Sequence, residues 1–515
     1  MSIPPTIVGF NSSIRVPGFY GQTQFGASPI SAASLPLILL LVGTKLTAGT
    51  ATANQDINAV TSSDQADALY GAGSELSLGC YAALTVPGVT ILAAPVAEAG
   101  GAVAATLTIT ITGTATGSGQ VTYRLNGESI STGINTGDTP TVIAGNIVTA
   151  LNQNTRRPYT AANVSGVVTV TVKSKGARGN QYIAFQDVTQ IAASVTSALA
   201  GGTPVTGGGV PFSGGTGVES AATLIALLSG QQYDRIVCAE NDSTNLGLWS
   251  TFLNSAAGST SNLLDHFIYR TNGTRAAAIT LANTANQQRM QAQLYVNGET
   301  YPFVGAAWWG ATRCSTEQTD PAASSVYDGM VSALDAPQSQ RADWPTNTQL
   351  NSSINNGVTE LGTSTNGAQA LITRSVTTHT LNGTNPDYRT LDTSQAYVPD
   401  FVRRDIGLFW TSFFKQQNPR VMDDPPAGVK ELPAGIATPA TWNAAITQKL
   451  RNYERGALAS GSSPTAQTVP PIIINVDGNL PTSVYSAAQP CILSTIPVYT
   501  APADHQIGVL VAQVG

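Results

Sequence analysis

Charged residues are scarce in this chain of 515 residues. Asp, Glu, Lys and Arg make up 10% of it, against about 25% in ordinary soluble domains. Disordered chains combine low hydrophobicity with high net charge, whereas this chain is 42% hydrophobic with a formal net charge of −6. We therefore expect a folded protein, and its length is enough for about three domains.

Basic clusters are missing as well. The adjacent basic pairs are Arg156-Arg157 and Arg403-Arg404, and no longer run of Lys or Arg occurs. Binding to nucleic acid requires a cationic stripe that neutralises several phosphates. Two isolated pairs in an acidic chain do not form such a stripe, so we expect no nucleic-acid partner.

The sequence also lacks a long hydrophobic run. Its most apolar stretch, Leu35 to Val42, is less than half of the about 20 residues that cross a bilayer, and Pro36 lies inside it. A buried strand is the better interpretation, and we expect no membrane insertion. The first residues, Met1 to Pro5, carry neither the basic segment nor the apolar stretch of a secretory signal, so no Sec-type export is expected.

Cysteine and histidine are few. The cysteines stand far apart without a C-x-x-C pair, and we interpret them as small buried apolar residues in a reducing compartment. No histidine has a second one at the spacing of zinc ligands. These residues are Cys80, Cys238, Cys314, Cys491, His266, His379 and His505.

Catalytic motifs are absent too, since neither G-x-S-x-G nor G-x-x-x-x-G-K-[ST] occurs. Two acidic groups could hold a cation, although the prolines after the first favour a turn: Asp423-Asp424, and Asp387 with Asp392 and Asp400. Trp308-Trp309 is interpreted as a strand segment with core packing, with an interface role for the outer ring as the alternative. We expect no catalytic residue, no cofactor and no metal, and therefore no enzyme.

Composition divides the chain into four parts. Prolines and small residues fill 1–34, which predicts an extended N-terminal arm. An α/β middle domain is expected at 35–95 plus 205–364, interrupted by a β-rich outer module at 96–204. Residues 365–515 are expected to form an inner C-terminal domain that ends in a strand at about 505–515.

The middle domain shows alternating strands and helices. Strands are expected at 35–42, 89–94, 235–239, 266–269, 277–281 and 303–307, and helices at 56–70, 221–228, 246–256 and 284–294. This βαβ pattern predicts a mostly parallel sheet flanked by helices. The fold class is therefore mixed α/β (α+β), multidomain, with a βαβ-type core.

The inserted module has strictly alternating strands. Apolar residues recur at every second position in Thr106 to Thr112, Gln120 to Leu125 and Val167 to Val172. Asn126-Gly127 predicts a hairpin turn, and Thr139 to Asn152 a helix. The glycine-rich stretch 201–217 is interpreted as a linker.

The C-terminal part contains the clearest helical patterns. A helix is expected at 400–417, capped by Asp400, and a second one from Thr438, with an apolar face of Trp442, Ile446, Leu450 and Tyr453. Strands are expected at 368–372, 375–380, 472–476 and 507–514. A terminal strand requires a partner strand.

At this point the sequence resembles the contractile tail sheath family of bacteriophages, particularly the Mu-like branch. The resemblance covers nearly the whole chain through loose motifs in the expected order. They are Ile14-Arg15-Val16-Pro17-Gly18-Phe19-Tyr20, Val121-Thr122-Tyr123-Arg124-Leu125-Asn126-Gly127, Lys175-Gly176-Ala177-Arg178-Gly179-Asn180, Arg374-Ser375-Val376-Thr377-Thr378, Tyr388-Arg389 and Tyr397-Val398-Pro399-Asp400.

The resemblance implies a virion subunit that forms hexameric rings, stacked helically around a tail tube, and contracts to drive the tube through the host envelope. It implies assembly in the host cytoplasm, with the tail tube protein and the baseplate and tail terminator proteins as further partners. Terminal arms would complete a sheet at 365–480 in a neighbouring subunit. The implied residues are Ile14, Arg15, Val16, Pro17, Phe19 and Tyr20 in the N-terminal arm, Ile507, Val509, Leu510, Val511 and Val514 in the donor strand, and Arg403, Arg404 and Lys415 on a tube-facing helix.

Three alternatives stay open. The sheath of a tailocin or another contractile injection particle would have the same kind of subunit. A secreted adhesin or surface-layer protein fits the Thr-rich module and sequons such as Asn272-Gly273-Thr274, although the missing export signal counts against it. An enzyme with an unrecognised active site is the third.

Overall fold

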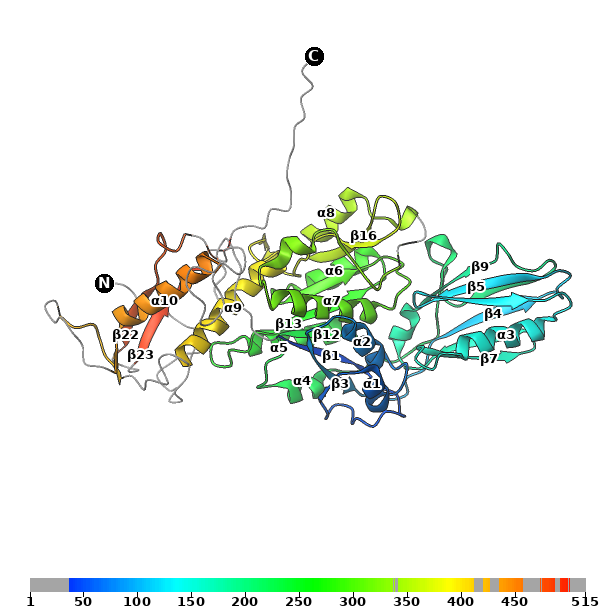
Figure 1. Cartoon of the computed structure of the whole chain (residues 1–515), viewed down its shortest axis with the longest axis horizontal. Coiled ribbons are helices and arrows are strands. Elements are labelled where there is room, and N and C mark those ends of the chain that lie inside the picture. The colour runs from blue at the N-terminus through cyan, green and yellow to red at the C-terminus, as the bar shows by residue number, and fades with distance from the viewer. Residues whose placement is uncertain are drawn as a thin grey trace, which may run out of the picture.

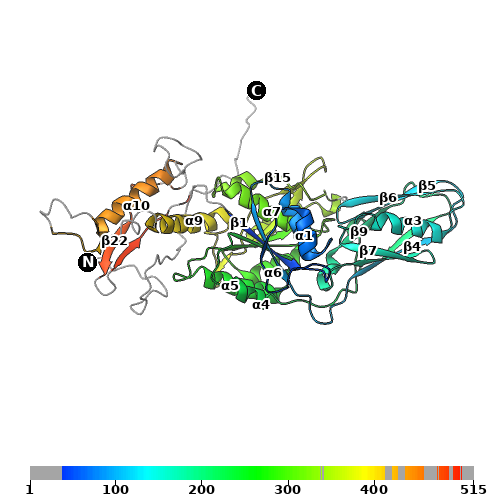
Figure 2. The same cartoon turned by 60° about the horizontal axis from the view of Figure 1, so that its bottom comes forward.

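A nine-stranded sheet forms the centre of an elongated molecule (Figure 1). The computed structural model describes residues 37–336, 338, 341–411, 420–426, 435–456, 473, 475–486, 491–498 and 500. A module built from residues 106–211 projects from one end of the centre, and the two last helices extend from the other (Figures 1 and 2).

The central sheet has the strand order β15-β17-β16-β14-β13-β12-β1-β3-β2. The pairs from β16 to β3 are parallel, and the outer strands β2, β15 and β17 run antiparallel to their neighbours. The bounds are β1 Ile38–Thr44, β2 Asn58–Ala59, β3 Thr90–Val96, β12 Arg235–Cys238, β13 His266–Thr271, β14 Met290–Leu294, β15 Met330–Val331, β16 Val358–Thr363 and β17 Ala370–Ile372.

Strand β1 shows why this sheet is covered on both faces. Leu39 and Leu41 belong to one hydrophobic core, and Leu40 and Val42, which point the other way, belong to a second. All four side chains are fully buried. A continuous apolar run is therefore what a parallel sheet between two helical layers requires.

Helices cover the two faces. On one face lie α1 Ser63–Tyr70, α2 Glu75–Leu84 and α7 Pro302–Glu317, and on the other α4 Ala222–Leu228, α5 Ser243–Ala256 and α6 Arg275–Ala285. Helix α8, Asn347–Asn355, packs beside β16. Short 3-10 turns are η1 Ala177–Gln181, η2 Thr206–Gly208, η3 Ala323–Tyr327 and η4 Arg341–Asp343.

The projecting module contains two four-stranded antiparallel sheets and one helix. One sheet has the order β10-β4-β8-β7 and the other β11-β9-β5-β6. Their inward residues and the apolar side of α3 share one core. The bounds are β4 Thr106–Thr112, β5 Gly119–Leu125, β6 Glu128–Ile134, α3 Pro140–Asn152, β7 Tyr159–Val164, β8 Val167–Val172, β9 Ile183–Asp187, β10 Thr196–Ala200 and β11 Val210–Pro211.

The C-terminal part begins with short strands and ends in a helix packed on a two-stranded sheet. Trp442 Nε1 of that helix donates to Ser494 Oγ of the sheet at 3.0 Å. The bounds are β18 Leu381–Asn382, β19 Asn385–Pro386, α9 Thr393–Phe409, β20 Arg420–Val421, β21 Ile436–Ala437, α10 Pro439–Glu454, β22 Thr482–Ser486 and β23 Cys491–Thr495.

The fold confirms the mixed α/β class and its βαβ core. The three alternating segments of the module are strands β4, β5 and β8, and Asn126 and Gly127 join β5 to β6 with positive φ values of 53° and 75°. Helix α10 buries the expected apolar face. These patterns predicted the strands and the helix correctly, because one face of each element is buried and the other exposed.

Three expectations in the middle domain were wrong. Residues 277–281 lie in α6 instead of a strand, and 303–307 lie in α7. The helix expected at 284–294 is replaced by the end of α6 and by β14. Helix α7 is buried at nearly every position, so its short apolar run carries no period that separates strand from helix.

The glycine-rich stretch 201–217 is more ordered than a linker. It contains β11, and Ser213 and Thr216 form isolated bridges with Thr106 and Val103. Conversely, 375–380 forms a single bridge, between Val376 and Asp392, in place of a strand. Residues 473, 475 and 476 show no strand, and 507–514 lies outside the described residues.

The helix expected to start at Asp400 starts seven residues earlier, at Thr393. Asp392 precedes it, and its backbone N–H donates to Gln395 Oε1 at 3.3 Å. Pro399 lies inside the helix, and Asp400 is a buried interior residue rather than a cap. The sequence interpretation took Pro399 as the start of the helix. Packing against the rest of the molecule can keep a helix continuous through a proline.

Two glycines on helices test this packing. A methyl group on Gly79 of α2 would collide with the Phe303 ring, whereas one on Gly247 of α5 meets nothing within 4 Å. We expect Gly79→Ala to lower the free energy of unfolding by about 1–3 kcal/mol through overpacking. Gly247→Ala should raise it by about 0.5–1 kcal/mol, since alanine is the better helix former. Chemical denaturation of both variants measures this, and equal effects would contradict the α2–α7 contact.

Candidate functional site

The first place to examine is the carboxyl edge of the parallel sheet between β1 and β12. Strand order reverses here, because β1 continues to β3 on one side and the later strands follow β12 on the other. Open α/β sheets bind ligands in the crevice at such a point. In this chain, side chains of the protein itself fill it.

Arg178 of η1, in the module, occupies the crevice. Its guanidinium donates to Glu75 Oε1 and Oε2 at 2.9 and 2.6 Å and also pairs with Glu219. Glu75 accepts from the backbone N–H and the hydroxyl of Thr44, at the end of β1, at 2.9 and 3.0 Å. We call Glu75, Arg178 and Glu219 the module junction.

The electrostatics of the module junction favour a closed structural contact. Burial alone would raise the pKa of Glu75, but Arg178 and its hydrogen bonds hold that pKa below its ordinary value. Glu240 is fully buried nearby, and burial raises its pKa. Tyr301 stacks on Tyr182 of the module with ring centroids 4.3 Å apart. Cys238 Sγ donates to Glu240 Oε2 at 3.0 Å, but burial and the neighbouring Glu240 raise the pKa of this thiol well above its ordinary value, so it is not an activated nucleophile.

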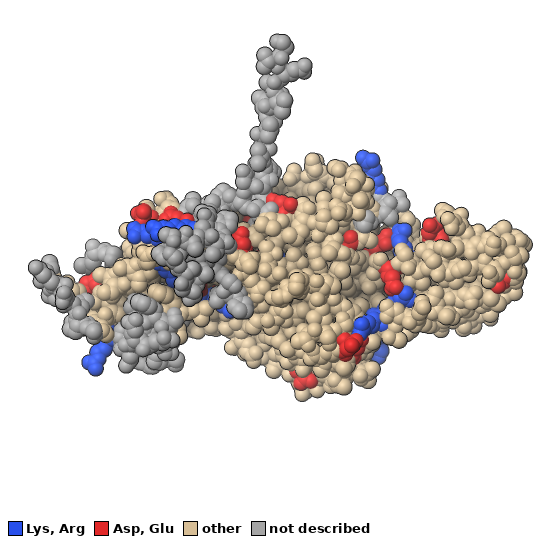
Figure 3. Space-filling view, viewed as in Figure 1, with Lys and Arg blue, Asp and Glu red and all other residues tan. Residues whose placement is uncertain are grey.

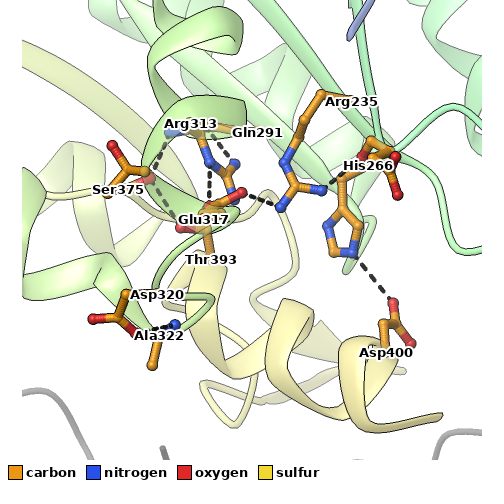
Figure 4. A network of polar contacts seen from close by, with 12 residues as sticks. Arg235, His266, Gln291, Arg313, Glu317, Asp320, Ala322, Ser375, Thr393 and Asp400 are labelled. Carbon is orange, nitrogen blue, oxygen red and sulfur yellow. Dashed lines mark hydrogen bonds and ion pairs between the residues drawn. The ribbon is translucent and has the colours of Figure 1, made fainter. Parts of the chain in front are cut away.

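The second polar cluster attaches α9 to the sheet (Figure 4). Asp400 of α9 accepts from Arg289 Nε and Nη2, at 2.5 and 2.7 Å, and lies 3.2 Å from His266 Nε2. Arg404, one turn further, pairs with Asp234. We call Asp234, His266, Arg289, Asp400 and Arg404 the α9 junction.

Burial and charge act against each other in the α9 junction. Burial by itself would raise the pKa of Asp400, but attraction by Arg289 and the hydrogen bonds from His266 and Arg289 hold it well below its usual range. Burial lowers the pKa of His266 to about 4, although its hydrogen bond to Asp400 opposes the shift. At neutral pH the pair is therefore a carboxylate and a neutral imidazole that donates to it.

A chain of buried contacts continues from the sheet to the start of α9. Arg313 and Trp309, both on α7, donate to Gln291 Oε1 at 3.0 Å each. Gln291 Nε2 donates to Ser375 Oγ at 3.0 Å, and this hydroxyl lies 2.9 Å from that of Thr393 (Figure 4). The first residue of α9 is thus held by a hydrogen bond, and ion pairs of Asp400 and Arg404 hold the helix further along.

Arg235, at the start of β12, supports the same helix. Its guanidinium lies 4.1 Å from the ring centroid of Tyr397 and pairs with Glu317 of α7 (Figure 4). Burial would raise the pKa of Glu317, but Arg235 and Arg313 lower it. Both ends of this contact are fully buried.

Comparison with known proteins gives one curated sequence match to report. The "Mu-like prophage FluMu tail sheath protein" of Haemophilus influenzae is 27% identical over 182 residues, which is 34% of this chain and 36% of the relative. The resemblance to tail sheath proteins is confirmed. The match thus spans about a third of the sheath relative's length, and no family model matches the chain.

Solved structures of sheath proteins were also found. The sheath tail proteins of Desulfitobacterium hafniense and Listeria innocua align at TM-scores of 0.44 and 0.45 with 12% and 10% identity. They cover 93% and 92% of this chain, and 98% and 94% of their own chains. A chain of the anti-feeding prophage baseplate aligns at 0.47 and 10% identity, over 97% and 99%.

The residues expected to face a tube make contacts within the chain. Arg403 is 7% exposed and donates to the carbonyl oxygens of Ala257 and Gly258 at 2.9 and 3.0 Å. Burial lowers its pKa to about 10, so it stays charged at neutral pH. Arg404 is used in the α9 junction. Lys415 lies outside the described residues, and a tube-facing role for this helix stays a prediction.

The two segments expected to be terminal arms fall outside the described residues entirely. This applies to Ile14, Arg15, Val16, Pro17, Phe19 and Tyr20, and to Ile507, Val509, Leu510, Val511 and Val514. The strand-donor assignments therefore stay predictions.

Of the two acidic groups weighed as cation sites, Asp423-Asp424 forms a turn-like contact in which Asp424 Oδ1 accepts from the backbone N–H of Ala440 at 3.0 Å, and the second group is used in ion pairs. Asp387 pairs with Arg389, Asp392 with Arg374, and Asp400 with Arg289. Over the described part of the chain, no group of three or more His, Cys, Asp or Glu is placed to hold a metal ion. Nor does any helix found there have the length and apolarity to cross a membrane.

The tryptophan pair was misplaced in the sequence interpretation. Trp308 and Trp309 lie on α7, and both are buried, at 7% and 0% exposure. Core packing is therefore correct, but on a helix that packs on the sheet beside α2. The buried Cys80, Cys238 and Cys314 are free thiols.

Removing the Asp400 charge tests the α9 junction. Asp400→Asn leaves Arg289 buried without its carboxylate, so we expect a loss of about 3–5 kcal/mol in the free energy of unfolding at pH 7. Asp477→Asn is the matched control, because Asp477 is 75% exposed where it pairs with Arg451. It should leave the unfolding curve nearly unchanged. Denaturant titration decides, and equal effects would show that the buried pair is not stabilising.

A buried carboxyl beside the α9 junction predicts a pH effect. Asp265 accepts from the backbone N–H of Tyr233 at 2.8 Å, and burial raises its pKa to about 8. The folded chain therefore keeps a proton that the unfolded chain loses near pH about 4. This group's contribution to the free energy of unfolding is full below that pH and falls as pH rises to about 8.

Asp265→Asn removes this titration. We expect the melting temperature of the variant, relative to wild type, to rise between pH 5 and pH 8.5, as measured by circular dichroism. Asp423→Asn, which changes an exposed carboxyl, is the control. A variant that keeps a constant offset from wild type over this pH range would contradict the assignment.

Proposed function

We propose that this chain is a structural subunit of a contractile tail sheath of the phage type. The observation that carries the proposal is the sequence match to the FluMu tail sheath protein over 182 residues. The motifs of the resemblance, which run from Ile14 to Asp400 in order, support it over a longer part of the chain. The role is mechanical, and it needs no cofactor or nucleotide.

In the proposed assembly, subunits form hexameric rings that stack helically around a tail tube. Contraction of this lattice drives the tube through the host envelope. The partners are other copies of the chain, the tail tube protein, and the baseplate and tail terminator proteins. The sheath assembles in the host cytoplasm and becomes part of the virion tail.

The acceptor that we propose for donated strands is the β22–β23 sheet. Strands β22 and β23 pair with each other over five residues each and, among the described residues, with no other strand. Their side chains are mostly half-buried, and α10 packs against them. A two-stranded sheet is marginal by itself and gains stability from added strands.

This acceptor lies later in the chain than the sequence interpretation placed it. The described strands between 365 and 480 are two or three residues long, and β17 among them belongs to the central sheet. We therefore move the acceptor from 365–480 to β22 and β23. The donors remain the arms at 1–34 and about 505–515.

We further propose the division into an outer module at 96–204, a middle domain at 35–95 plus 205–364, and an inner domain from 365. The α9 junction links the inner and middle domains through the Arg289–Asp400 ion pair, which is buried on both sides, the Arg404–Asp234 ion pair and the His266–Asp400 hydrogen bond. Separating a buried ion pair costs much free energy, because each charge would then be buried without its partner. The two domains therefore move together during contraction. The arms, joined by backbone hydrogen bonds, keep subunits connected while other interfaces change.

Electron microscopy of the purified full-length protein tests the function. We expect hollow tubes or stacked six-fold rings in negative stain. Deleting residues 507–515 should remove the tubes, because it removes the donor strand, while the melting curve of the subunit stays the same. Asp477→Asn, an exposed change near the acceptor, is the control that should still form tubes. Dispersed particles of the full-length chain under all conditions would refute the sheath function, and tubes from the deletion would refute the donor strand.

A further inference from the structure

The projecting module has a charge opposite to that of the rest of the chain. Its residues 106–211 include six basic and three acidic ones, a formal net charge of +3, whereas the whole chain has −6. They are Arg124, Arg156, Arg157, Lys173, Lys175 and Arg178, with Glu128, Asp138 and Asp187. In Figure 3 the charged side chains of this region gather where the module meets the central body, and few lie toward its far end. Charge is therefore concentrated at the contact between the two.

The ion pairs across this contact all have the same polarity among the described residues. In each pair the cation belongs to the module and the carboxylate to the rest of the chain. The pairs are Arg124–Glu299, Arg156–Asp64, Arg156–Asp67, Lys175–Glu98, Arg178–Glu75 and Arg178–Glu219. A positive surface of the module thus meets a negative surface of the central body, and this complementarity favours one docked orientation.

These ion pairs differ in depth. In the module junction the side chain of Arg178 is 11% exposed, and its two carboxylate partners are 4% and 2% exposed. The other three cations are more accessible, with side chains that are 34%, 39% and 55% exposed: Arg124, Arg156 and Lys175. We call the ion pairs of these three cations the outer pairs. Exposed ion pairs are weak and are screened by salt, whereas buried ones are screened much less.

The outer pairs lie on both sheets of the module. Arg124, on β5 of one sheet, donates to the two carboxylate oxygens of Glu299 at 3.1 and 2.9 Å. Arg156, just before β7 of the other sheet, donates to Asp67 Oδ2 of α1 at 2.7 Å. Contacts from both sheets hold the module against tilting in more than one direction.

Polar groups also form much of the centre of the contact. Gln181 of η1 and Asn241 exchange two amide hydrogen bonds of 3.1 Å each. Asn126 Oδ1 accepts from the backbone N–H of Tyr301 at 2.8 Å, and the Tyr182–Tyr301 stack adds an apolar contact. Water can replace such hydrogen bonds when the surfaces separate. Contacts of this polar kind between domains usually permit relative motion.

Two segments connect the module to the central body, 97–105 and 212–221. Two backbone hydrogen bonds, of 3.0 and 3.2 Å, join them at Val103 and Thr216. Gly101 and Gly214 have positive φ values of 74° and 79°, and a Cβ on either would meet no atom within 4 Å. Glycines in such open surroundings can change φ and ψ at little steric cost. These segments can therefore act as a hinge.

We propose that the projecting module opens as a rigid body about the two connecting segments, and that the outer pairs hold it closed. In the closed state the buried pairs of Arg178 make the module and the central body one unit. Loss of the outer pairs admits water to Arg178, and attraction between charges is weaker in water than in the interior. The opposite charges of the two surfaces return the module to the same orientation.

Hydrogen–deuterium exchange of the full-length protein, followed by mass spectrometry, tests this opening. Arg124→Gln, Arg156→Gln and Lys175→Gln, combined in a triple variant, remove the outer cations. We expect exchange in the two connecting segments to become about threefold faster or more, because opening breaks the hydrogen bonds between them. Exchange in β1, β4, β8 and β12 should not change, because the module and the central body both stay folded.

Arg451→Gln is the matched control. Its exposed ion pair with Asp477 lies in the C-terminal part, so this variant should keep the wild-type exchange rate in the connecting segments. Salt gives a second measurement, since raising the ionic strength from about 0.1 M to about 1 M shortens the Debye length from about 10 Å to about 3 Å. Added salt should speed exchange in wild type and control, but no further in the triple variant, which has no outer pairs to screen.

An exchange of charges separates attraction from packing. Arg156→Asp places a carboxylate opposite Asp64 and Asp67, so alone it should speed exchange in the connecting segments by about twofold or more. Adding Asp67→Arg restores an ion pair of reversed polarity and should return the rate to that of wild type. Circular dichroism should show both variants folded, since the side chains of Arg156 and Asp67 are 39% and 22% exposed.

Three results would overturn the proposal. An unchanged rate in the triple variant would show that the outer pairs do not hold the module. Faster exchange that extends equally through β4 and β8 would show that the module unfolds instead of opening. Failure of Asp67→Arg to restore the rate would show that the effect is not electrostatic. The opening takes place within one chain, so it stands or falls separately from tube formation and from the sheath function.

Discussion

The buried contact between Asp400 and Arg289 is the constraint on which the attachment of the C-terminal part depends. Both side chains lie inside the molecule, where neither charge is stable without the other. The contact fixes the rotation of α9, and it holds that helix across the proline at position 399. Everything beyond α9, including α10 and the β22–β23 sheet, takes its starting position from this helix.

Several of the few charged residues lie inside the molecule. Arg178, Arg235 and Arg289 are each buried against carboxylates at places where one part of the chain meets another. A buried pair gives a contact a unique geometry, because hydrogen bonds to a guanidinium tolerate little displacement. By contrast, strands β4, β7, β8 and β10 of the projecting module carry no charged residue.

These features together suit a protein that transmits force. Parts joined by buried ion pairs behave as one body, and the β22–β23 sheet pairs with no further strand among the described residues. The crevice where other α/β proteins bind ligands is occupied by Arg178 and its carboxylates. In the proposed sheath, the subunit acts through its contacts with other subunits and not through a ligand bound in this crevice.

The sequence by itself determined the elements that have one buried face. The strands at Thr106–Thr112 and Val167–Val172 and helix α10 followed from alternation or helical spacing, because solvent on one side imposes a period. Only the tertiary structure decided elements that are buried all round, such as α7, whose apolar run fits a strand or a helix equally well. It also decided the partners of Arg178, Arg289 and Asp400, which are far apart in sequence. Buried charges pair where the folded chain brings them together, and no local sequence pattern shows which distant residues will meet.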